Sequence, residues 1–362
     1  MRNSLGEQII FTLFGESHGP YIGGTLDNLP AGLVVDEERI KRALARRRPD
    51  GKSSTARVER DAFQIISGVY KGHTTGEPLT LIIQNENVHS GDYPEGLVRP
   101  GHADYVAHEI SGGYNDPRGG GHFSGRLTAA IVALGEICRM ALEAKGVAVM
   151  THIYRIGDIY DQTFDNLEEN GKTLQNSNFP VLSKEKGEAM LALIQAVKAE
   201  QDSIGGVTET IISGLPLGLG NPWFGSLEGV LSNAVFGLGG VKGIEFGEGF
   251  NFASMKGSEA NDGYQYKDGK TVLLSNHNGG INGGISNGEP VVFRLAIKPI
   301  SSIGKAQSSI NTASHENVML ELKGRHDPCI VHRICSAVDG LTSIVLLDEF
   351  MKAFGKIYFC VK

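Results

Sequence analysis

The alternation of apolar and polar residues predicts short strands separated by amphipathic helices. Apolar runs rich in Ile, Leu and Phe, bounded by Gly or Pro, predict strands at residues 8–14, 63–69, 79–84 and 290–298. Residues 36–48 show helical spacing, and Asp36 is the expected N-cap of a helix that Pro49 stops.

Three longer segments also show helical spacing. They cover residues 127–145, with Gly146 as the expected C-cap, residues 183–199, and residues 331–354 with an interruption at Gly340. Strands and helices do not follow a strict βαβ alternation, and there is no long linker or clear internal repeat. The pattern alone leaves the α/β and α+β classes open.

Composition narrows the class of protein. The chain has 362 residues with 40% hydrophobic and 21% charged residues, which is typical of a globular enzyme. The formal net charge of −7 argues against a general nucleic-acid binder. Glycine accounts for 49 residues, about twice the usual ~7%, and it is clustered.

Cysteine spacing and the chain start bear on compartment. The chain has four cysteines without C-x-x-C spacing: Cys138, Cys329, Cys335 and Cys360. This spacing indicates free thiols in a reducing compartment, and we expect no metal site. No leader pattern opens the chain, and no apolar run reaches the ~18 residues of a membrane span. We therefore expect a cytoplasmic protein with no membrane partner.

The first candidate site is G-E-S-H-G at residues 15–19, which follows a predicted strand. His18 is a candidate general acid or base. Ser17 beside it does not lie in a G-x-S-x-G nucleophile elbow. The alternative is a turn in which the histidine only caps backbone groups.

The second candidate is R-P-G-H-A-D-Y at residues 99–105. Arg99 is suited to binding a phosphate or carboxylate, and His102 is a second acid or base candidate. The alternative is a loop entering a helix, with Asp104 pairing Arg99.

The third candidate is D-P-R-G-G-G-H-F-S-G-R at residues 116–126. Three glycines before a helix predict backbone N–H groups exposed at a helix N-terminus, which is an anion site, flanked by Arg118 and Arg126. The spacing fits neither the dinucleotide nor the P-loop motif. A purely structural glycine turn is the alternative.

Three further regions leave alternatives open. Residues 279–302 predict either a cofactor cradle, with Lys298, Ser301 and Ser302 as donors, or a glycine-rich hairpin. Arg325 and Asp327 would share one face of a strand, where a structural ion pair is the alternative. The basic run at residues 46–48 suits either the end of a helix dipole or a phosphate-binding edge. Together the clusters indicate an enzyme acting on an anionic, phosphorylated substrate.

Seven ordered motifs extend this interpretation. They are G-E-S-H-G, R-P-G-H-A-D-Y, R-G-G-G-H-F-S-G-R, V-K-G-I-E-F-G, G-G-I-S-N-G, K-P-I-S-S and G-R-H-D-P, running from about Phe11 to beyond Asp327. In this order they resemble the chorismate synthase family over nearly the whole chain.

The resemblance implies the last step of the shikimate pathway, a 1,4-anti elimination of phosphate from 5-enolpyruvylshikimate 3-phosphate that depends on reduced FMN. It implies an α+β fold, a β-α-β sandwich with antiparallel sheets around a helical core, as a single domain over residues 1–362 and a homotetramer. No separate nicotinamide-binding segment is evident, which favours an external flavin reductant over intrinsic use of NADPH. The alternatives are a flavin-dependent oxidoreductase and a flavin-binding homologue without catalysis.

The motif match also implies residue roles. His18 would protonate the leaving phosphate, His102 would hold the reduced flavin in its protonation state, and Asp327 would relay a proton near flavin N5, helped by Ser124. Substrate anions would be bound by five residues: Arg47, Arg99, Ser124, Arg126 and Arg325. The flavin would be held by His122, Phe123, Ser124, Gly239, Gly240, Gly283, Lys298, Pro299, Ile300, Ser301, Ser302 and Arg325.

The chain departs from the family pattern in places. The loop at residues 50–57 is shorter than usual, which puts contacts there in question. His122, Phe123 and Ser124 stand where Arg-Ser-Ser is commoner, and His332 replaces a usual proline. None of these changes removes a proposed catalytic group.

Overall fold

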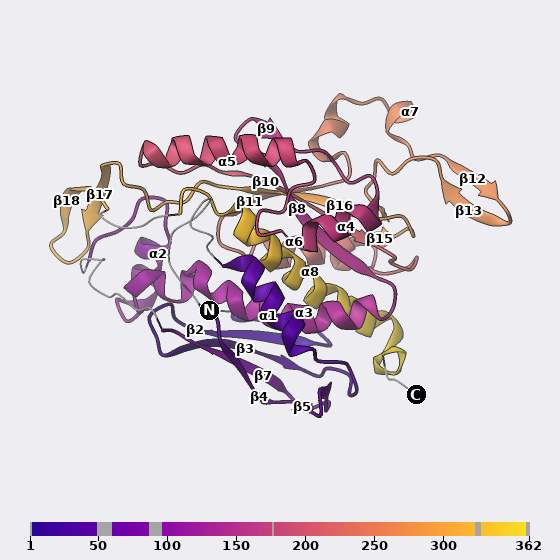
Figure 1. Ribbon diagram of the computed structural model, residues 1–362, viewed down its shortest axis with the longest axis horizontal. Coiled ribbons are helices and arrows are strands. Elements are labelled where there is room, and N and C mark those ends of the chain that lie inside the picture. Colours follow the sequence, from indigo (N-terminus) through magenta and orange to yellow (C-terminus); the bar gives the residue numbers. More distant parts are fainter. Residues whose placement is uncertain (1, 49–59, 87–95, 176, 323–326, 360–362) are drawn as a thin grey trace.

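Two antiparallel sheets of five strands each lie on either side of a central layer of helices (Figure 1). The computed structural model describes residues 2–48, 60–86, 96–175, 177–322 and 327–359. The first sheet has the order β1 (Ser4–Leu5), β2 (Ile10–Gly15), β3 (Tyr21–Asp27), β7 (Leu79–Gln84) and β4 (Phe63–Ser67). The second has the order β11 (Val241–Phe246), β16 (Val291–Ile297), β10 (Gly206–Ser213), β8 (Ala148–Ile156) and β9 (Ile159–Tyr160).

Helices fill the space between the two sheets. Figure 1 shows α3 (Thr128–Glu143) and α8 (Val331–Phe354) between the layers, where α3 packs on β3 and β7 and α8 packs on β8 and β10. Residues 129–142 of α3 are all buried. A helix that is buried around its whole circumference needs cover on every side, which the flanking sheets and helices provide. The expected α+β sandwich with a helical core is confirmed.

The remaining elements surround this core. They are α1 (Glu37–Arg47), β5 (Val69–Tyr70), β6 (His73–Thr74), α2 (Asp104–Ser111), α4 (Leu167–Gln175), α5 (Lys184–Ala199), α6 (Leu227–Val235), α7 (Gly257–Ala260), β12 (Tyr264–Lys267), β13 (Lys270–Leu273), β14 (Ile281–Asn282), β15 (Ile285–Ser286), β17 (Gln307–Asn311) and β18 (Glu316–Leu320). Among the described residues, no helix is long and apolar enough to cross a membrane.

Helix ends follow the predicted signals. Asp36 caps α1, since its side chain accepts from the backbone N–H groups of Glu38 and Arg39. Beyond α3, Gly146 adopts a φ of 82°, and the N–H of Val147 returns to the carbonyl of Leu142. A left-handed residue that closes such a bond ends a helix with little strain only when it is glycine.

The predicted interruption at Gly340 is wrong, because α8 is continuous through it. Gly340 instead lies where α8 crosses α3. A Cβ built on Gly135 would lie 2.3 Å from the Cα of Gly340, and one built on Gly340 would lie 2.9 Å from the carbonyl oxygen of Ile131. Both glycines are needed so that the two central helices can touch backbone to backbone.

The predicted strand at residues 63–69 is two strands. β4 ends at Ser67, and β5 turns away to pair with β6. Gly68 between them has a φ of 83°, outside the extended region, and its position against Leu79 leaves no room for a Cβ. The glycine therefore redirects the chain where the apolar pattern continues.

The second sheet contains a buried charged cluster away from the helical core. His152 of β8 contacts Asp161 through Nδ1 and Glu209 of β10 through Nε2, both at 3.1 Å. Glu209 also accepts from Arg294 of β16 at 2.9 Å. Asp161 in turn accepts from the backbone N–H of Ser183, the N-cap of α5. The cluster joins three strands to an outer helix.

The two ends of the chain meet at α8. The carboxylate of Asp348 accepts from the backbone N–H groups of Glu7, Gln8 and Ile9, with distances of 2.7–3.1 Å. Three amides on one buried carboxylate fix the start of the first sheet to the last long helix.

Candidate active site

His18 lies in a tight turn directly after β2. Gly19 closes the turn by donating to the carbonyl of Glu16 at 3.1 Å. The side-chain amide of Asn85 donates to the carbonyls of Glu16 and Gly19, at 3.0 and 2.8 Å. The turn is thus held by the residue that follows β7, and the His18 side chain is nearly buried.

His102 lies in the loop before α2 and is held by two charged neighbours. Asp104 Oδ1 lies 2.6 Å from His102 Nδ1, and Arg99 forms a two-point ion pair with Asp104 at 2.7 Å on each side. Burial alone would raise the pKa of Asp104, but the hydrogen bonds and charges of Arg99 and His102 outweigh it and hold the pKa well below its usual range. The pairing of Arg99 with Asp104 is as the sequence suggested.

The glycine run brings the two histidines together. A Cβ built on Gly119 would lie 2.6 Å from His18 Nε2, and one built on Gly120 would lie 3.2 Å from His102 Cε1. Since consecutive Cα atoms are only ~3.8 Å apart, the two imidazoles flank adjacent positions of one backbone strip. Gly119 and Gly120 have φ values of 60° and 85°, so glycine is required for conformation as well as space. We call residues 119–120 the glycine strip.

The prediction that the glycine run lies at the N-terminus of a long helix is wrong. Two short 3₁₀ turns, Arg118–Phe123 and Gly125–Leu127, precede α3, which begins at Thr128. Positive φ values at three successive glycines cannot continue into a right-handed helix. Arg118 forms an ion pair with Asp116 at 2.8 Å, which lowers the pKa of Asp116.

The segment after β16 joins the same loop. Lys298 Nζ and Ser301 Oγ both donate to the carbonyl of Gly101, at 2.6 and 2.8 Å, and Arg99 donates to Ser302 Oγ at 3.3 Å. The backbone N–H of Lys298 donates to the carbonyl of Gly240. Motifs far apart in the sequence thus surround the His102 loop.

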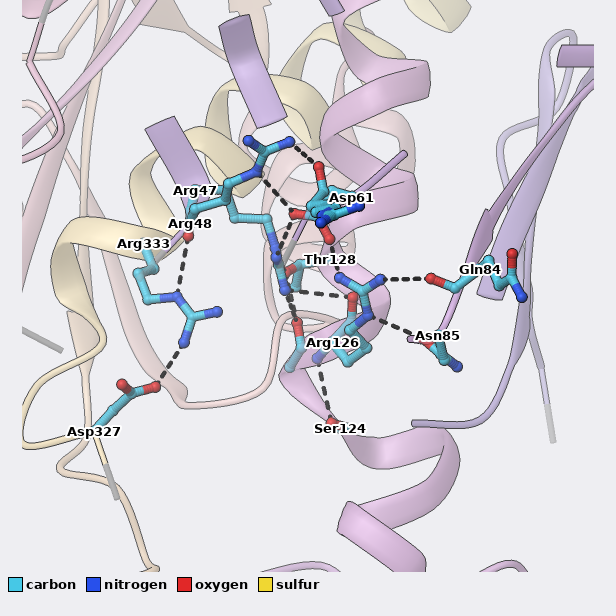
Figure 2. Close-up of polar contacts among 12 residues, drawn as sticks. Arg47, Arg48, Asp61, Gln84, Asn85, Ser124, Arg126, Thr128, Asp327 and Arg333 are labelled. Atoms are coloured by element: carbon cyan, nitrogen blue, oxygen red, sulfur yellow. Dashed lines mark hydrogen bonds and ion pairs between the residues drawn. The ribbon is translucent and has the colours of Figure 1, made fainter. Parts of the chain in front are cut away.

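Figure 2 shows a second group of contacts centred on Asp61. This buried carboxylate contacts the guanidinium groups of Arg126, Arg47 and Arg48. Arg126 also donates from Nε to Asn85 Oδ1 at 3.0 Å, which links the group to the His18 turn.

Asp327 connects to this group through one arginine. Arg333 of α8 contacts Asp327 at 2.6 Å and donates to the backbone carbonyl of Arg47 at 3.1 Å (Figure 2). Asp327 lies in the connection between β18 and α8 rather than on a strand. Arg325, its predicted partner, lies outside the described residues. A continuous polar network therefore runs from Asp327 through Arg47 and Asp61 to Arg126 and the turn that carries His18.

Comparisons with known proteins agree with this arrangement. The family profile described as chorismate synthase matches residues 9–351. The chain belongs to the chorismate synthase family. The chorismate synthase of Aeropyrum pernix is 43% identical over 350 residues, covering 96% of this chain and 92% of the relative. That of Korarchaeum cryptofilum is 41% identical, covering 96% and 97%. A crystal structure of a chorismate synthase superposes with a TM-score of 0.75 at 29% identity, covering 97% and 93%.

The other residues that the family resemblance assigned to flavin fall into two groups. His122 bonds the Gly15 carbonyl at 2.8 Å, beside the turn that carries His18, and the Ser124 hydroxyl accepts from the backbone N–H of Arg126. Phe123 is partly exposed next to His122. Ile300 is anchored through its carbonyl, which accepts from Ser203, and Pro299 is exposed between Lys298 and Ile300.

Two predicted flavin glycines have a different setting. Gly239 is exposed, with no heavy atom within 4 Å of a built Cβ. Gly283 lies in the turn of the β14–β15 hairpin. Figure 1 shows β15 and α2 at opposite ends of the molecule. Within one chain, Gly283 is thus remote from the loop that carries His102.

Sequence reasoning missed Asp61 and Asn85. Asn85 had a readable signal, because a polar amide directly after a buried strand is well placed to hold a neighbouring turn. Asp61 had none: it adopts a φ of 50° in a connection, and only folding brings the arginines to it.

Proposed function

We propose that the protein converts 5-enolpyruvylshikimate 3-phosphate to chorismate and phosphate in a 1,4-anti elimination that depends on reduced FMN. Family membership supports the reaction class. The observation that carries the proposal for this chain is that His18 and His102 flank adjacent residues of the glycine strip. Two positioned acid and base groups are what loss of a phosphate and a ring hydrogen requires.

The residues around the His102 loop suit a flavin nucleotide. The glycine strip lets both imidazoles lie directly against the backbone. Lys298 and Ser301 donate to the Gly101 carbonyl, and the Ser302 hydroxyl accepts from Arg99. Ammonium and hydroxyl groups of this kind bind phosphate groups. Reduced FMN held there would supply electron density to the carbon skeleton of the substrate.

The chain's own groups would perform the remaining work. His18 protonates the departing phosphate, and His102 maintains the protonation state of the reduced cofactor. Asp327 relays a proton, with Ser124 assisting. Arg47, Arg99, Arg126 and Arg325 bind the carboxylates and phosphate of the substrate. Asp61 fixes Arg47 and Arg126 in place, because a buried guanidinium paired with a carboxylate has little rotamer freedom.

The wider setting follows from the same resemblance. We propose a single catalytic domain spanning the chain, a homotetramer in the cytoplasm, and an external source of flavin reduction. A flavin-dependent oxidoreductase and a non-catalytic flavin-binding homologue remain the two competing functions.

One anaerobic experiment separates these three functions. Protein, substrate and a substoichiometric amount of dithionite-reduced FMN are mixed, and chorismate, phosphate and flavin oxidation state are followed. The proposed reaction gives equal amounts of chorismate and phosphate over many turnovers per flavin. An oxidoreductase stops after one equivalent of reductant, and a non-catalytic homologue binds FMN without forming chorismate.

A further inference from the structure

Asp104 is the first residue of α2, yet its carboxylate serves the preceding loop rather than the helix. Oδ2 accepts from the backbone N–H of Arg99 at 3.0 Å and from Arg99 Nε at 2.7 Å. Oδ1 lies 2.7 Å from Arg99 Nη2 and 2.6 Å from His102 Nδ1. The N-cap of α2 is Ala103, which makes no side-chain capping bond. Both oxygens of Asp104 are therefore directed at Arg99 and His102.

These contacts determine which nitrogen of His102 carries the fixed proton. Nδ1 lies 2.6 Å from the carboxylate oxygen and 3.1 Å from Arg99 Nη2. The guanidinium can only donate, and the ionised carboxylate can only accept. A contact as short as 2.6 Å to a carboxylate needs a proton between the atoms, and only Nδ1 can supply it. Arg99 Nη2 then donates to the same carboxylate.

Nε2 of His102 is consequently the nitrogen left to exchange protons. A Cβ built on Gly120 would lie 3.4 Å from this atom, so Nε2 faces the glycine strip that also meets His18. We propose that Asp104 is a positioning residue that locks the His102 proton on Nδ1, directs Nε2 at the glycine strip and stabilises the charged imidazolium. The use of that nitrogen in catalysis rests on the proposed function, whereas the locking does not.

The charged groups around His102 act in opposite directions. Asp104 favours the imidazolium, while Arg99 opposes it as a like charge; Lys298 lies behind the loop, bonded to the Gly101 carbonyl. The carboxylate contact is the shorter of the two and is a charge-assisted hydrogen bond. Removing the Asp104 charge should make His102 lose its proton at lower pH, and removing the Arg99 charge should have the reverse effect.

Diethyl pyrocarbonate, which acylates only neutral imidazole, measures this directly. The modification rate of the His102 peptide is followed by mass spectrometry across pH 5–9. The His102 side chain is 22% exposed and so accessible to the reagent. Asp104→Asn keeps one side-chain oxygen that can accept from Nδ1, removes the negative charge and replaces the other acceptor oxygen with a donor. We expect the pH of half-maximal reactivity to fall by about one unit in Asp104→Asn and to rise in Arg99→Gln.

Asp161→Asn is the matched control, since Asp161 contacts another histidine Nδ1 in the second sheet. It should lower the melting temperature and leave the His102 profile unchanged. Unchanged His102 profiles in Asp104→Asn and Arg99→Gln would overturn the proposal, and the second variant decides the matter if the first does not fold.

The activity profile links the positioning role to the reaction. In Asp104→Asn, the limb of the kcat profile that disappears in a His102→Ala variant should move to lower pH, and Asp104→Glu should restore part of the shift. A shifted acylation profile without chorismate formation by any form of the protein would leave the positioning role intact and reject the proposed function.

Discussion

At the scale of residues, two histidines reach one strip of backbone from separate loops. His18 is held by Asn85, and His102 is held by Asp104, while the glycine strip leaves room for both rings. Asp104 orients the His102 ring, whereas Asn85 fixes the backbone of the turn from which His18 projects. Such support fixes a group within the small tolerance that proton transfer allows.

Replacement of either histidine tests its role. We expect His18→Ala and His102→Ala each to lower chorismate formation at least about tenfold, because a positioned acid or base contributes ~10²–10⁴ in rate. FMN affinity, followed by flavin absorbance, should change little. The control His73→Ala alters an exposed histidine on β6 and should retain full activity. Turnover like that of the unaltered protein in either site variant would reject the assigned role.

Asp61 should matter for stability as well as for the site. Asp61→Asn leaves Arg47 and Arg126 with a neutral partner in a buried position, and breaking a buried pair in this way costs about 3–5 kcal/mol. Urea unfolding measures the loss. Asp158→Asn breaks an exposed ion pair with Arg155 and should leave the midpoint unchanged. Equal midpoints for the two variants would mean that Asp61 does not anchor the arginines.

The sequence indicated the histidines but not all of their surroundings. Gly-rich loops that carry His18 and His102 have an unusual composition that can be read directly. The contacts of Asp61 have no such signature, because they join residues from α1, the β4 approach and the 3₁₀ turn before α3. Only the tertiary fold determines which carboxylate meets which arginine.

At the scale of elements, the crossing of α3 and α8 depends on two glycines. Gly135→Ala places a methyl group 2.3 Å from the Gly340 backbone, and backbone cannot yield as a side chain can. We expect a loss of at least about 2 kcal/mol in unfolding free energy.

Gly257→Ala is the control for that crossing, since a Cβ there meets nothing within 4 Å. Chemical denaturation should show it as neutral or slightly stabilising, because alanine favours helix. A small effect of Gly135→Ala would show that the helices can separate without cost.

The charged cluster of the second sheet predicts a pH dependence. Burial alone would lower the pKa of His152, but the hydrogen bonds and charges of Asp161 and Glu209 raise it, and His152 in turn lowers theirs. A raised histidine pKa adds stability that is complete below its ordinary value of 6.5 and is lost as pH rises through the folded value. The carboxylates add stability that is lost as pH falls below about 4.5.

We expect the loss of unfolding free energy caused by His152→Gln to be largest between these two limits. The loss should become smaller at lower and at higher pH. Unfolding free energies at pH 3.5, 5.5 and 9 measure it, and the difference should be largest at pH 5.5. His73→Gln, an exposed control, should show a difference that does not vary with pH. A constant difference for His152→Gln would mean that the cluster is not ionised in the folded state.

Periodicity predicted elements best where packing and local pattern agree. Residues 79–84 and 331–354 were bounded as the structure has them, since both are apolar on the faces that packing buries. The errors occurred at glycines. Gly68 breaks a strand and Gly340 does not break a helix, and the difference lies in the neighbour that each glycine meets rather than in the residue itself.

At the scale of the whole molecule, both sheets share the α3–α8 layer. One hydrophobic core includes Leu81 of the first sheet, Leu134 of α3 and Phe293 of the second sheet. Neither sheet can keep its inner face buried without these helices. We therefore predict that the chain unfolds as one cooperative unit.

Hydrogen exchange under increasing urea tests this prediction. Peptides from β3 and β7 should lose protection together with peptides from β10 and β16. The β12–β13 hairpin, whose strands are mostly exposed, should exchange earlier and serves as the internal reference for local opening. Two separated transitions for the two sheets would indicate two domains.

The hydrogen bonds from the backbone amides of residues 7–9 to the Asp348 carboxylate affect how the protein folds during synthesis. Residues 7–9 leave the ribosome more than 300 residues before Asp348, the acceptor of their amides. The strands of the first sheet can pair with one another during translation, but the apolar face of the sheet stays exposed to solvent until α8 has been synthesised. For much of translation, the nascent chain therefore exposes an apolar surface that a chaperone can bind.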